Sequence, residues 1–498
     1  MRGLVFLFCM VSGTHSAERL VQLFEWRFDD IARECRGLSR QEWLHGSSGS
    51  HRSQNVLCLV VDHDETVPPF SYKIISRSGV SIHSKACDRC SKVGVGIIVD
   101  VLLNHMSTNT PLGTVGTGGA IPTPTNKSYP AVPYTAEHFH PTCQITDYNN
   151  ATNVRVCELV LLHDLNQTQE YVRGKLVDHL NHLVDLGATG FRIDAAKHMY
   201  PEDIQIILKR VKKPSNGKNL FIFQEVPDDT GPEAIKAEEY FDIGLVTEFK
   251  FASGIKNHIA NLSSLKDFGK DLMDSKHAVI FTDNHDRQRD FPFNYKIPSI
   301  YKLANAFMLG WSYGHSKKVM SSYQFTTTDD GPPHNDDMSI KNVTISSEGV
   351  CGNGWICEHR WPEIAAMVRF AKAVEGSGSS DFVAHSPNTI SFQRTGKGFV
   401  LLSADNPPKN LTNVQTGLKR GIYCDIITNP GPTGNCTSTK IEVNSEGKAN
   451  FSFPLNSPNN YTIIAIHLTG GVSAVNCSAL VLMLSSFLVT ILAERHRC

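Results

Sequence analysis

The sequence predicts an α/β protein: a (β/α)8 TIM barrel with an inserted loop-rich subdomain and a C-terminal antiparallel β-sandwich domain. Short apolar runs that end in polar residues alternate with amphipathic stretches, which is typical of parallel strands and the helices that cover them. The spacing of the polar run ends fits repeated βα units with one long insertion. After about residue 375 the pattern changes to short alternating runs. A chain of 498 residues has room for two or three domains.

Four apolar runs are expected to form buried parallel strands, because they are rich in β-branched residues and unbroken in apolar character. They are VGVGIIVDVLLNH (93–105), GATGFRIDAAKH (187–198), NLFIFQEV (219–226) and HAVIFTDNHD (277–286). The stretch from Glu170 to Leu186 carries apolar residues at helical spacing and is predicted to be a helix. Strand and helix therefore alternate.

The polar ends of these runs are spaced as a barrel requires, since a barrel of about 250 residues spends roughly 31 residues on each βα unit. Asp194 and Glu225 are 31 positions apart, or one unit, and Glu225 and Asp286 are 61 positions apart, or two units. The run LVTEFK (245–250) can supply the strand between them. Asp100 precedes Asp194 by 94 positions, so about 60 residues are inserted between those two strands.

These patterns divide the chain into domains. We expect the barrel to span residues 17–104 and 165–375, the inserted subdomain residues 105–164, and the β-sandwich residues 376–470. The insert is rich in Pro, Gly, Thr and Tyr and lacks helical periodicity. The sandwich strands are expected in runs separated by Gly, Asn and Pro turns, namely TISFQRT, GFVLLSA, GIYCDII, KIEVN, ANFSF and YTIIAIH.

Both ends of the chain carry signals for location. Residues 1–16, MRGLVFLFCMVSGTHS, place a basic residue before an apolar stretch and end in small residues, which predicts a cleaved secretory signal peptide. Ten Asn-x-Ser/Thr sequons agree with a secreted glycoprotein. Residues 471–498 form a hydrophobic tail whose run SALVLMLSSFLVTILA is short for a bilayer span. An anchor signal, a membrane helix and a plain extension all stay open for this tail, so surface anchoring is an alternative to free secretion.

The 13 cysteines of a secreted chain are expected mostly to pair. Three bridges are suggested by close spacing, and a fourth candidate joins more distant cysteines: Cys351 with Cys357, Cys424 with Cys436, Cys143 with Cys157, and Cys35 with Cys90. Cys9 leaves with the signal peptide, and four others have no evident partner, namely Cys58, Cys87, Cys477 and Cys498. Reduced structural thiols are the alternative interpretation.

The balance of charged residues indicates which classes of partner the protein can bind. With 48 basic and 49 acidic residues the formal net charge is -1, which offers no basic field for nucleic acid. We therefore expect no nucleic-acid partner and a neutral substrate. We also expect the protein to be a monomer.

Three carboxylates at strand ends are the candidate chemistry. The C-terminal ends of barrel strands converge on one pocket, so Asp194, Glu225 and Asp286 should meet there. A retaining glycoside hydrolase needs a nucleophilic carboxylate and a second carboxyl with a raised pKa that donates a proton. Glu225 follows three apolar residues, which suits the proton donor. Without further motifs, helix capping or metal binding is the alternative for such carboxylates.

Longer motifs around these residues narrow the interpretation. GFRIDAAKH (190–198) resembles the nucleophile strand of the α-amylase family, QEV (224–226) its acid/base strand, FTDNHD (281–286) its third-carboxylate strand, and DVLLNH (100–105) its first conserved region. The order is also that of the family. The resemblance is greatest to animal α-amylases and runs from LFEW (23–26) through EHRW (358–361) to the C-terminal IAIH.

The resemblance implies roles for these residues. Asp194 would be the nucleophile, Glu225 the general acid/base, and Asp286 a carboxylate that stabilises the transition state and holds sugar hydroxyls. The positions that would line the glucose subsites of an α-glucan are His105, Lys197, His198 and His285. The implied activity is internal hydrolysis of α-1,4-glucosidic bonds in starch and glycogen.

The resemblance also implies two ions. A structural calcium would lie between the barrel and the insert, held at the positions Asn104, Arg155, Asp164 and His198, with Arg155 and His198 contributing carbonyl oxygens. A chloride beside the acid/base would be held at Arg192, Asn284 and Lys318. Arg is usual at the last position, and a Lys keeps the charge but loses the planar fork, so we expect weaker anion binding.

One region departs from the family. From Cys35 to Val67 the sequence lacks the expected second barrel strand and the Trp-Trp-x-x-Tyr sugar platform, and a short piece at 80–87 departs as well. The barrel is then expected to have either an open edge or a substitute strand, for which NVLCLVV (55–61) is available. The loop DRQRDFPFNYK (286–296) also lacks the glycine-rich segment usual in animal forms.

Two other functions therefore stay open. One is an α-glucosidase on the same fold, against which EHRW and the C-terminal β-domain argue. The other is a secreted or surface-tethered glycan-binding paralogue without useful turnover, suggested by the altered region from Cys35 to Cys87.

Overall fold

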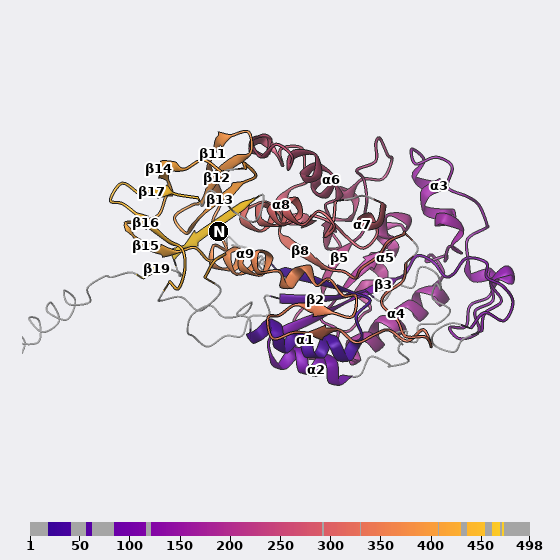
Figure 1. Ribbon diagram of the computed structural model, residues 1–498. Helices are drawn as coiled ribbons and strands as arrows, with labels where there is room; N and C mark the ends of the chain where they lie inside the picture. Colours follow the sequence, from indigo (N-terminus) through magenta and orange to yellow (C-terminus); the bar gives the residue numbers. More distant parts are fainter. Residues whose placement is uncertain are drawn as a thin grey trace, which may run out of the picture.

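The computed structural model describes residues 18–40, 56–61, 84–115, 121–290, 293–328, 330–406, 408–429, 436–453, 461–468 and 471–472. The expected signal peptide, most of the apolar tail and most of the altered region between Cys35 and Cys87 lie outside the described residues. In Figure 1 the barrel lies between the C-terminal sheets at one end and the segment that carries α3 (Ala151–Val156) at the other. Within the described ranges, no helix has the length and apolar character needed to cross a membrane.

Eight parallel strands close into a barrel in chain order, which confirms the predicted fold class. β1 pairs with both β2 and β8 and so closes the ring. The strands are β1 (Arg19–Phe24), β2 (Val56–Val61), β3 (Val95–Leu102), β4 (Gly190–Asp194), β5 (Phe221–Gln224), β6 (Leu245–Thr247), β7 (Ala278–Phe281) and β8 (Ser316–Ser321).

The second strand comes from inside the altered region. β2 pairs in parallel with β1, where Val56 lies opposite Arg19, and with β3, where Val56 lies opposite Val95. This is the run expected as a substitute strand, so the barrel has no open edge there. The β-branched apolar sequence of this run is typical of strands in a parallel sheet.

Helices follow the strands around the barrel, with α1 and α2 beside β2 (Figure 1). α4 coincides with the helix predicted from periodicity, and the residues that it buries include Val172, Leu176 and Leu180. The barrel-associated helices are α1 (Phe28–Arg40), α2 (Ser84–Lys92), α4 (Glu170–Asp185), α5 (Pro201–Lys209), α6 (Phe249–His258), α7 (Arg287–Asp290), α8 (Pro298–Gly310) and α9 (Pro362–Ala373). Short 3-10 turns occur at η4 (Ala196–His198), η5 (Ala237–Tyr240), η6 (Leu262–Asp267), η7 (Ser275–His277) and η8 (Glu358–Arg360).

The chain between β3 and α4 has little regular structure. It holds α3 and the turns η1 (Pro124–Asn126), η2 (Ala136–His138) and η3 (Leu159–Leu161). An isolated bridge between His105 and Asp164 joins its two ends, and a second one between Phe139 and Leu165 ties its middle to its end. Tyr129 is fully buried within it. The bridges bring the start and the end of the segment back to the same rim of the barrel.

The C-terminal region forms antiparallel sheets, as expected. Sequence-adjacent residues of β13 (Gly398–Ser403) face opposite sides: Val400 belongs to the core cluster shared with the barrel, whereas Phe399 and Leu401 belong to a second core. Alternation of side chains along a strand explains how one sheet covers two cores. The other strands of this region are β11 (Ser379–Ser386), β12 (Thr389–Arg394), β14 (Leu411–Gln415), β15 (Gly421–Cys424), β16 (Lys440–Val443), β17 (Lys448–Phe451), β18 (Thr462–His467) and β19 (Gly471–Val472). Between β8 and α9, β9 (Thr344–Ile345) and β10 (Cys351–Gly352) form a separate two-stranded sheet.

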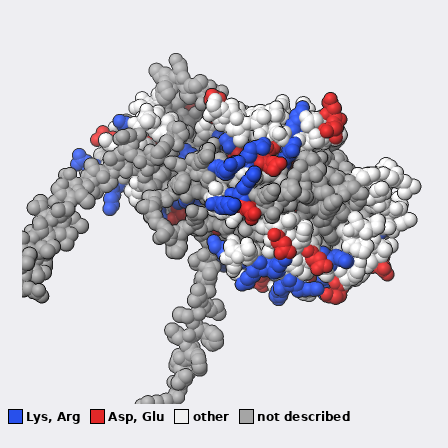
Figure 2. Space-filling model, turned by 90° about the horizontal axis from the view of Figure 1, so that it is seen from below, with Lys and Arg blue, Asp and Glu red and all other residues white. Residues whose placement is uncertain are grey.

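All four predicted disulfides are present, namely Cys35–Cys90, Cys143–Cys157, Cys351–Cys357 and Cys424–Cys436. Cys87 is a buried free thiol. On the face shown in Figure 2, basic and acidic side chains lie interspersed among uncharged ones.

Candidate active site

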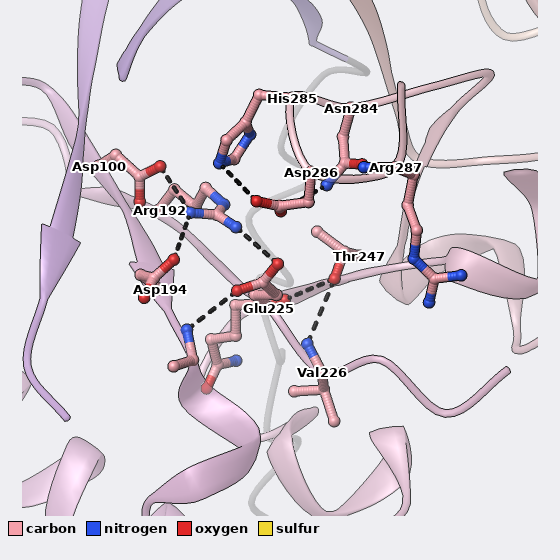
Figure 3. Close-up of polar contacts among 12 residues, drawn as sticks. Asp100, Arg192, Asp194, Glu225, Val226, Thr247, Asn284, His285, Asp286 and Arg287 are labelled. Carbon is pink, nitrogen blue, oxygen red and sulfur yellow. Dashed lines mark hydrogen bonds and ion pairs between the residues drawn. The ribbon is translucent and has the colours of Figure 1, made fainter. Parts of the chain in front are cut away.

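The three predicted carboxylates occupy one end of the barrel. Asp194 is the last residue of β4, Glu225 directly follows β5, and Asp286 lies between β7 and α7. Because these strands are parallel, their C-terminal ends meet at the same rim. Figure 3 shows the three carboxylates grouped around the guanidinium of Arg192.

Arg192 organises this group through ion pairs. Its Nη1 lies 2.5 Å from Asp100 Oδ2 and 2.9 Å from Asp194 Oδ1, and its Nη2 lies 2.7 Å from Glu225 Oε1. Register explains the first two contacts, since Arg192 of β4 pairs with Asp100 of β3 and Asp194 follows two positions later on the same face. The planar guanidinium can bind several carboxylates at once, which a lysine could not do with the same geometry.

The backbone after β4 supplies another donor to Glu225. The amide nitrogen of Ala195 donates to Glu225 Oε2 over 3.0 Å. Ala195 has a φ of 46°, in the left-handed region that non-glycine residues rarely adopt. Strained backbone of this kind is held by its surroundings and is common at functional sites. At the other end of β4, a Cβ on Gly190 would overlap the carbonyl oxygen of Phe221, so the close approach of β4 and β5 needs glycine.

Glu225 is the group best prepared to give up a proton. Its burial raises its pKa above the ordinary value, and the charges of Asp194 and Asp286 raise it further. Arg192 and the amide of Ala195 oppose this rise without cancelling it. The side chain of Glu225 is 12% exposed, compared with 15% for Asp194 and 40% for Asp286. A carboxyl with a raised pKa beside two more exposed carboxyl groups is the arrangement used in acid/base chemistry.

Asp286 is held on both of its oxygens. His285 Nε2 lies 3.2 Å from Oδ1, and the side-chain amide of Asn284 donates to Oδ2 over 3.0 Å. Both residues are buried. These two contacts, drawn in Figure 3, fix the orientation of the Asp286 carboxylate. Its side chain remains partly exposed.

The other predicted glucose-site residues divide into two groups. Lys197 lies beside the three carboxylates, because its backbone nitrogen donates to Glu225 O over 3.1 Å. Its ammonium forms an ion pair with Glu233 and donates to Pro227 O over 2.6 Å. His105 and His198 lie at the junction with the insert. All four side chains predicted for the glucose subsites, including His285, are buried.

The predicted calcium residues form a second cluster at this junction. The side-chain oxygen of Asn104 faces Asp164 Oδ1 at 3.2 Å and the carbonyl oxygen of His198 at 3.0 Å. His198 Nδ1 contacts Val154 O over 3.1 Å, which brings α3 and its residue Arg155 to the same place. These oxygens repel one another unless a cation lies among them. The repulsion is also relieved if the Asn104 amide is turned over, because its nitrogen then donates to Asp164 and to the carbonyl of His198. An amide, a carboxylate and carbonyl oxygens are the ligands that calcium prefers.

This cluster contains few of the groups that bind transition metals. Among the described ranges, no set of three or more His, Cys, Asp or Glu side chains is arranged to hold a metal. The donors around Asn104 are mainly amide and carbonyl oxygens, so they fit calcium better than zinc or iron.

The predicted chloride residues are all buried, and Arg192 and Asn284 contact the three carboxylates directly. Arg192 and Asn284 direct donors at protein carboxylates, as described above. Lys318 donates to Gln22 Oε1 over 2.5 Å and to Asp283 O over 3.3 Å, and no carboxylate within the described residues forms a salt bridge with it. Burial lowers its pKa. A buried ammonium without a salt-bridge partner fits a nearby anion.

Three polar residues of the site were not found from the sequence. Asp100 binds Arg192, Gln22 bridges Lys318 and His285, and Thr247 donates to Gln224 O over 3.1 Å. Asp100 had a detectable signal, because it is a charged residue inside an apolar run. Gln22 and Thr247 are single polar residues on predicted strands, and only barrel closure shows what they face.

Comparisons with known proteins point to one family. A family model described as "Alpha amylase, catalytic domain" matches residues 83–312. The "Alpha-amylase-related protein" of Drosophila atripex is 43% identical over 444 residues, which cover 86% of this chain and 89% of the relative. The protein of that name from Drosophila melanogaster shows the same identity and coverage. The crystal structure of alpha-amylase I from Eisenia fetida matches with a TM-score of 0.79 at 33% identity, covering 91% of this chain and 98% of that chain. A mutant of the Eisenia fetida protein was solved as a complex with maltohexaose.

Proposed function

Because the chain belongs to the alpha-amylase family, we propose that it is a secreted α-amylase, a glycoside hydrolase that cleaves internal α-1,4-glucosidic bonds of starch and glycogen with retention of configuration. The observation that carries this proposal is the pairing of Asp194 and Glu225 on one guanidinium, with burial raising the pKa of Glu225. A nucleophile and a protonated acid held together are the two parts that a retaining glycosidase needs.

In the proposed reaction the carboxylate of Asp194 attacks the anomeric carbon while Glu225 gives its proton to the leaving glycosidic oxygen. The glycosidic bond breaks and a glycosyl ester of Asp194 forms. Glu225, now ionised, takes a proton from water, and the water oxygen attacks the anomeric carbon and releases Asp194. Asp286, whose orientation His285 and Asn284 fix, binds sugar hydroxyls of the distorted ring. His105, Lys197, His198 and His285 are proposed to contact neighbouring glucose units.

Calcium is proposed at Asn104, Asp164 and the carbonyls of Arg155 and His198. When bound, it would supply a fixed positive charge that joins the insert to the barrel. Chloride is proposed beside Arg192, Asn284 and Lys318, where a negative charge would raise the pKa of Glu225 further. Lys318→Gln should then reduce the response of activity to added chloride, and an unchanged response would exclude Lys318 from anion binding.

Secretion is proposed from residues 1–16 and agrees with four disulfides, which persist in oxidising compartments. The ligand would be an α-glucan, the protein would act as a monomer, and no nucleic acid would be bound. Attachment to a membrane through residues 471–498 stays an alternative to free release.

The experiment is hydrolysis of soluble starch by the secreted protein in calcium and chloride, with Asp194→Asn as the control. Internal cleavage should release short maltooligosaccharides, and the variant should release none. Removal of single glucose units from chain ends would instead support an α-glucosidase.

A second candidate is a glycan-binding protein without turnover. It is favoured by the absence of the Trp-Trp-x-x-Tyr platform from the sequence between Cys35 and Val67, because aromatic side chains give sugars a stacking surface. Retention on a starch column by folded protein that releases no reducing sugar would support this function and contradict the proposed one.

A further inference from the structure

Gln22 lies on β1, far in sequence from Asp286, and is connected to it through His285. We propose that Gln22 is a positioning residue that holds His285 in the neutral form protonated on Nε2, so that this nitrogen donates to Asp286. The structural part of this proposal stands alone, whereas its effect on turnover rests on the proposed amylase function.

The contacts form one buried chain from β8 to Asp286. Lys318 Nζ donates to Gln22 Oε1 over 2.5 Å, and Gln22 Nε2 lies 2.9 Å from His285 Nδ1. His285 Nε2 lies 3.2 Å from Asp286 Oδ1. Gln22, Lys318 and His285 are each exposed by no more than 3%. Water therefore has little access to replace these hydrogen bonds.

Strand register explains why Gln22 and Lys318 meet. Lys318 of β8 pairs with Leu20 of β1, and Gln22 follows Leu20 by two positions. Residues two apart on a strand point to the same face. Gln22 and Lys318 therefore share one face of the barrel wall, at the seam where the first and last strands close the ring.

Lys318 decides which way the Gln22 amide faces. The hydrogens of the ammonium need an acceptor, and the amide oxygen is the acceptor that Gln22 offers. The amide nitrogen, which only donates, is thereby turned toward His285 Nδ1. A second donation from Lys318, to Asp283 O over 3.3 Å, holds the ammonium in place.

The orientation of the amide in turn fixes the proton on His285. Because Gln22 Nε2 donates, Nδ1 must accept and carries no hydrogen. A neutral imidazole then has its proton on Nε2, which faces a carboxylate oxygen of Asp286. An imidazolium would set an N–H of the ring against the N–H of the amide. Every donor along the chain meets an acceptor only in the neutral Nε2–H form.

The tautomer matters for Asp286 because its two oxygens have different donors. Asn284 donates to Oδ2, and His285 Nε2 lies 3.2 Å from Oδ1. If the proton moved to Nδ1, a bare nitrogen would face the carboxylate and repel it. Asp286 would then rotate away from the position in which it is proposed to bind sugar hydroxyls, and misplacement of this kind lowers turnover more than substrate binding.

The structural test reads the tautomer directly in the full-length protein labelled with 15N-histidine. The His285 signals are identified by their loss in His285→Ala. We expect an unprotonated Nδ1 and a protonated Nε2 in the parent protein. In Gln22→Glu the new carboxylate can accept from Lys318 and from His285 together, so the proton should appear on Nδ1. A parent signal with Nδ1 protonated, or no change in Gln22→Glu, would overturn the proposal.

The kinetic test is a double-mutant cycle on starch. Gln22→Met keeps the length of the side chain but removes both hydrogen bonds, and it should lower kcat by about 10- to 100-fold with a smaller change in KM. In the His285→Ala background the same substitution should change kcat by less than about twofold. Equal losses in both backgrounds would show that Gln22 does not act through His285.

Controls separate this proposal from folding and from the proposed function. Gln393→Met removes a buried glutamine of the C-terminal sheet and should leave kcat unchanged. Thermal unfolding of each variant reports whether it folds. If the parent protein hydrolyses no starch, the proposed amylase function is wrong. The 15N-histidine spectrum still shows which nitrogen of His285 carries the proton, so the two proposals are tested separately.

Discussion

Arg192 Nη2 lies 2.7 Å from Glu225 Oε1, yet the pKa of that carboxyl is raised. The ion pair by itself would favour the ionised form. Burial outweighs it, and the charges of Asp194 and Asp286 act in the same direction as burial. The guanidinium thus positions Glu225 while the pKa of this carboxyl stays raised. The raised pKa and the positioning role of Arg192 can each be tested.

The pH profile tests the protonation of Glu225. An acid with a raised pKa stays protonated until the pH rises through that raised value, so loss of the Glu225 proton should lower kcat/KM on the alkaline side of the profile. We expect the alkaline limb well above 4.5, the ordinary value for a glutamic acid. Glu225→Gln should lower kcat by about 10²- to 10⁴-fold and abolish the alkaline limb. A limb near the ordinary value would contradict the role of Glu225 as the acid.

Removal of Arg192 tests its structural role. Arg192→Met leaves the carboxylates Asp100, Asp194 and Glu225 without their shared partner, and Asp100 is almost fully buried. Breaking a buried pair in this way costs about 3–5 kcal/mol in the free energy of unfolding. Urea unfolding measures the loss.

The matched control is Arg210→Met, which breaks an exposed ion pair with Glu170. Exposed pairs contribute about 0–1 kcal/mol. Similar losses for the two variants would mean that Arg192 does not hold the carboxylates together.

Chelation tests the calcium cluster. EDTA should lower the midpoint of thermal unfolding and added calcium should restore it, because a ligand that binds only the folded state at 100 times its Kd stabilises that state by about 2.7 kcal/mol. Asp164→Asn should remove the difference, whereas Asp147→Asn, an exposed carboxyl of the same insert, should keep it. If neither EDTA nor calcium changes the midpoint, no calcium is bound. A turned Asn104 amide then explains its close approach to Asp164 and to the carbonyl oxygen of His198.

Removal of the Cys35–Cys90 disulfide tests how much this bridge stabilises the fold around the altered region. It closes a loop across 55 positions that includes β2. Replacing both cysteines by serine should lower the free energy of unfolding by about 4 kcal/mol, because the unfolded chain regains the freedom of a long loop. The same change at Cys351 and Cys357, separated by 6 positions, should cost less. Equal losses would mean that loop length does not set the effect.

Much of the fold could be predicted from the sequence because its signals are local. The apolar runs that became β4, β5 and β7 end at Asp194, Glu225 and near Asp286, and parallel strands bring such ends together. The apolar run at 55–61 was found as a strand candidate for the same reason. Its place between β1 and β3 could not be decided, because pairing partners are distant in sequence.

The network around His285 could not be predicted, because it depends on closure of the barrel. Gln22 and Lys318 are almost 300 positions apart, and only the pairing of β1 with β8 brings them together. Arg192 was expected from the family resemblance to hold chloride. Its three ion pairs with carboxylates became evident only when β3, β4 and β5 were placed in register.

The central claim is that Asp194 becomes covalently glycosylated. An α-maltotriosyl fluoride carries a leaving group that needs little help from an acid, so Glu225→Gln should form the glycosyl ester but release it slowly. Mass spectrometry of the digested protein should then show a maltotriosyl adduct on the peptide that contains Asp194. Consumption of the fluoride with no adduct on Asp194, or with an adduct on another residue, would contradict the account.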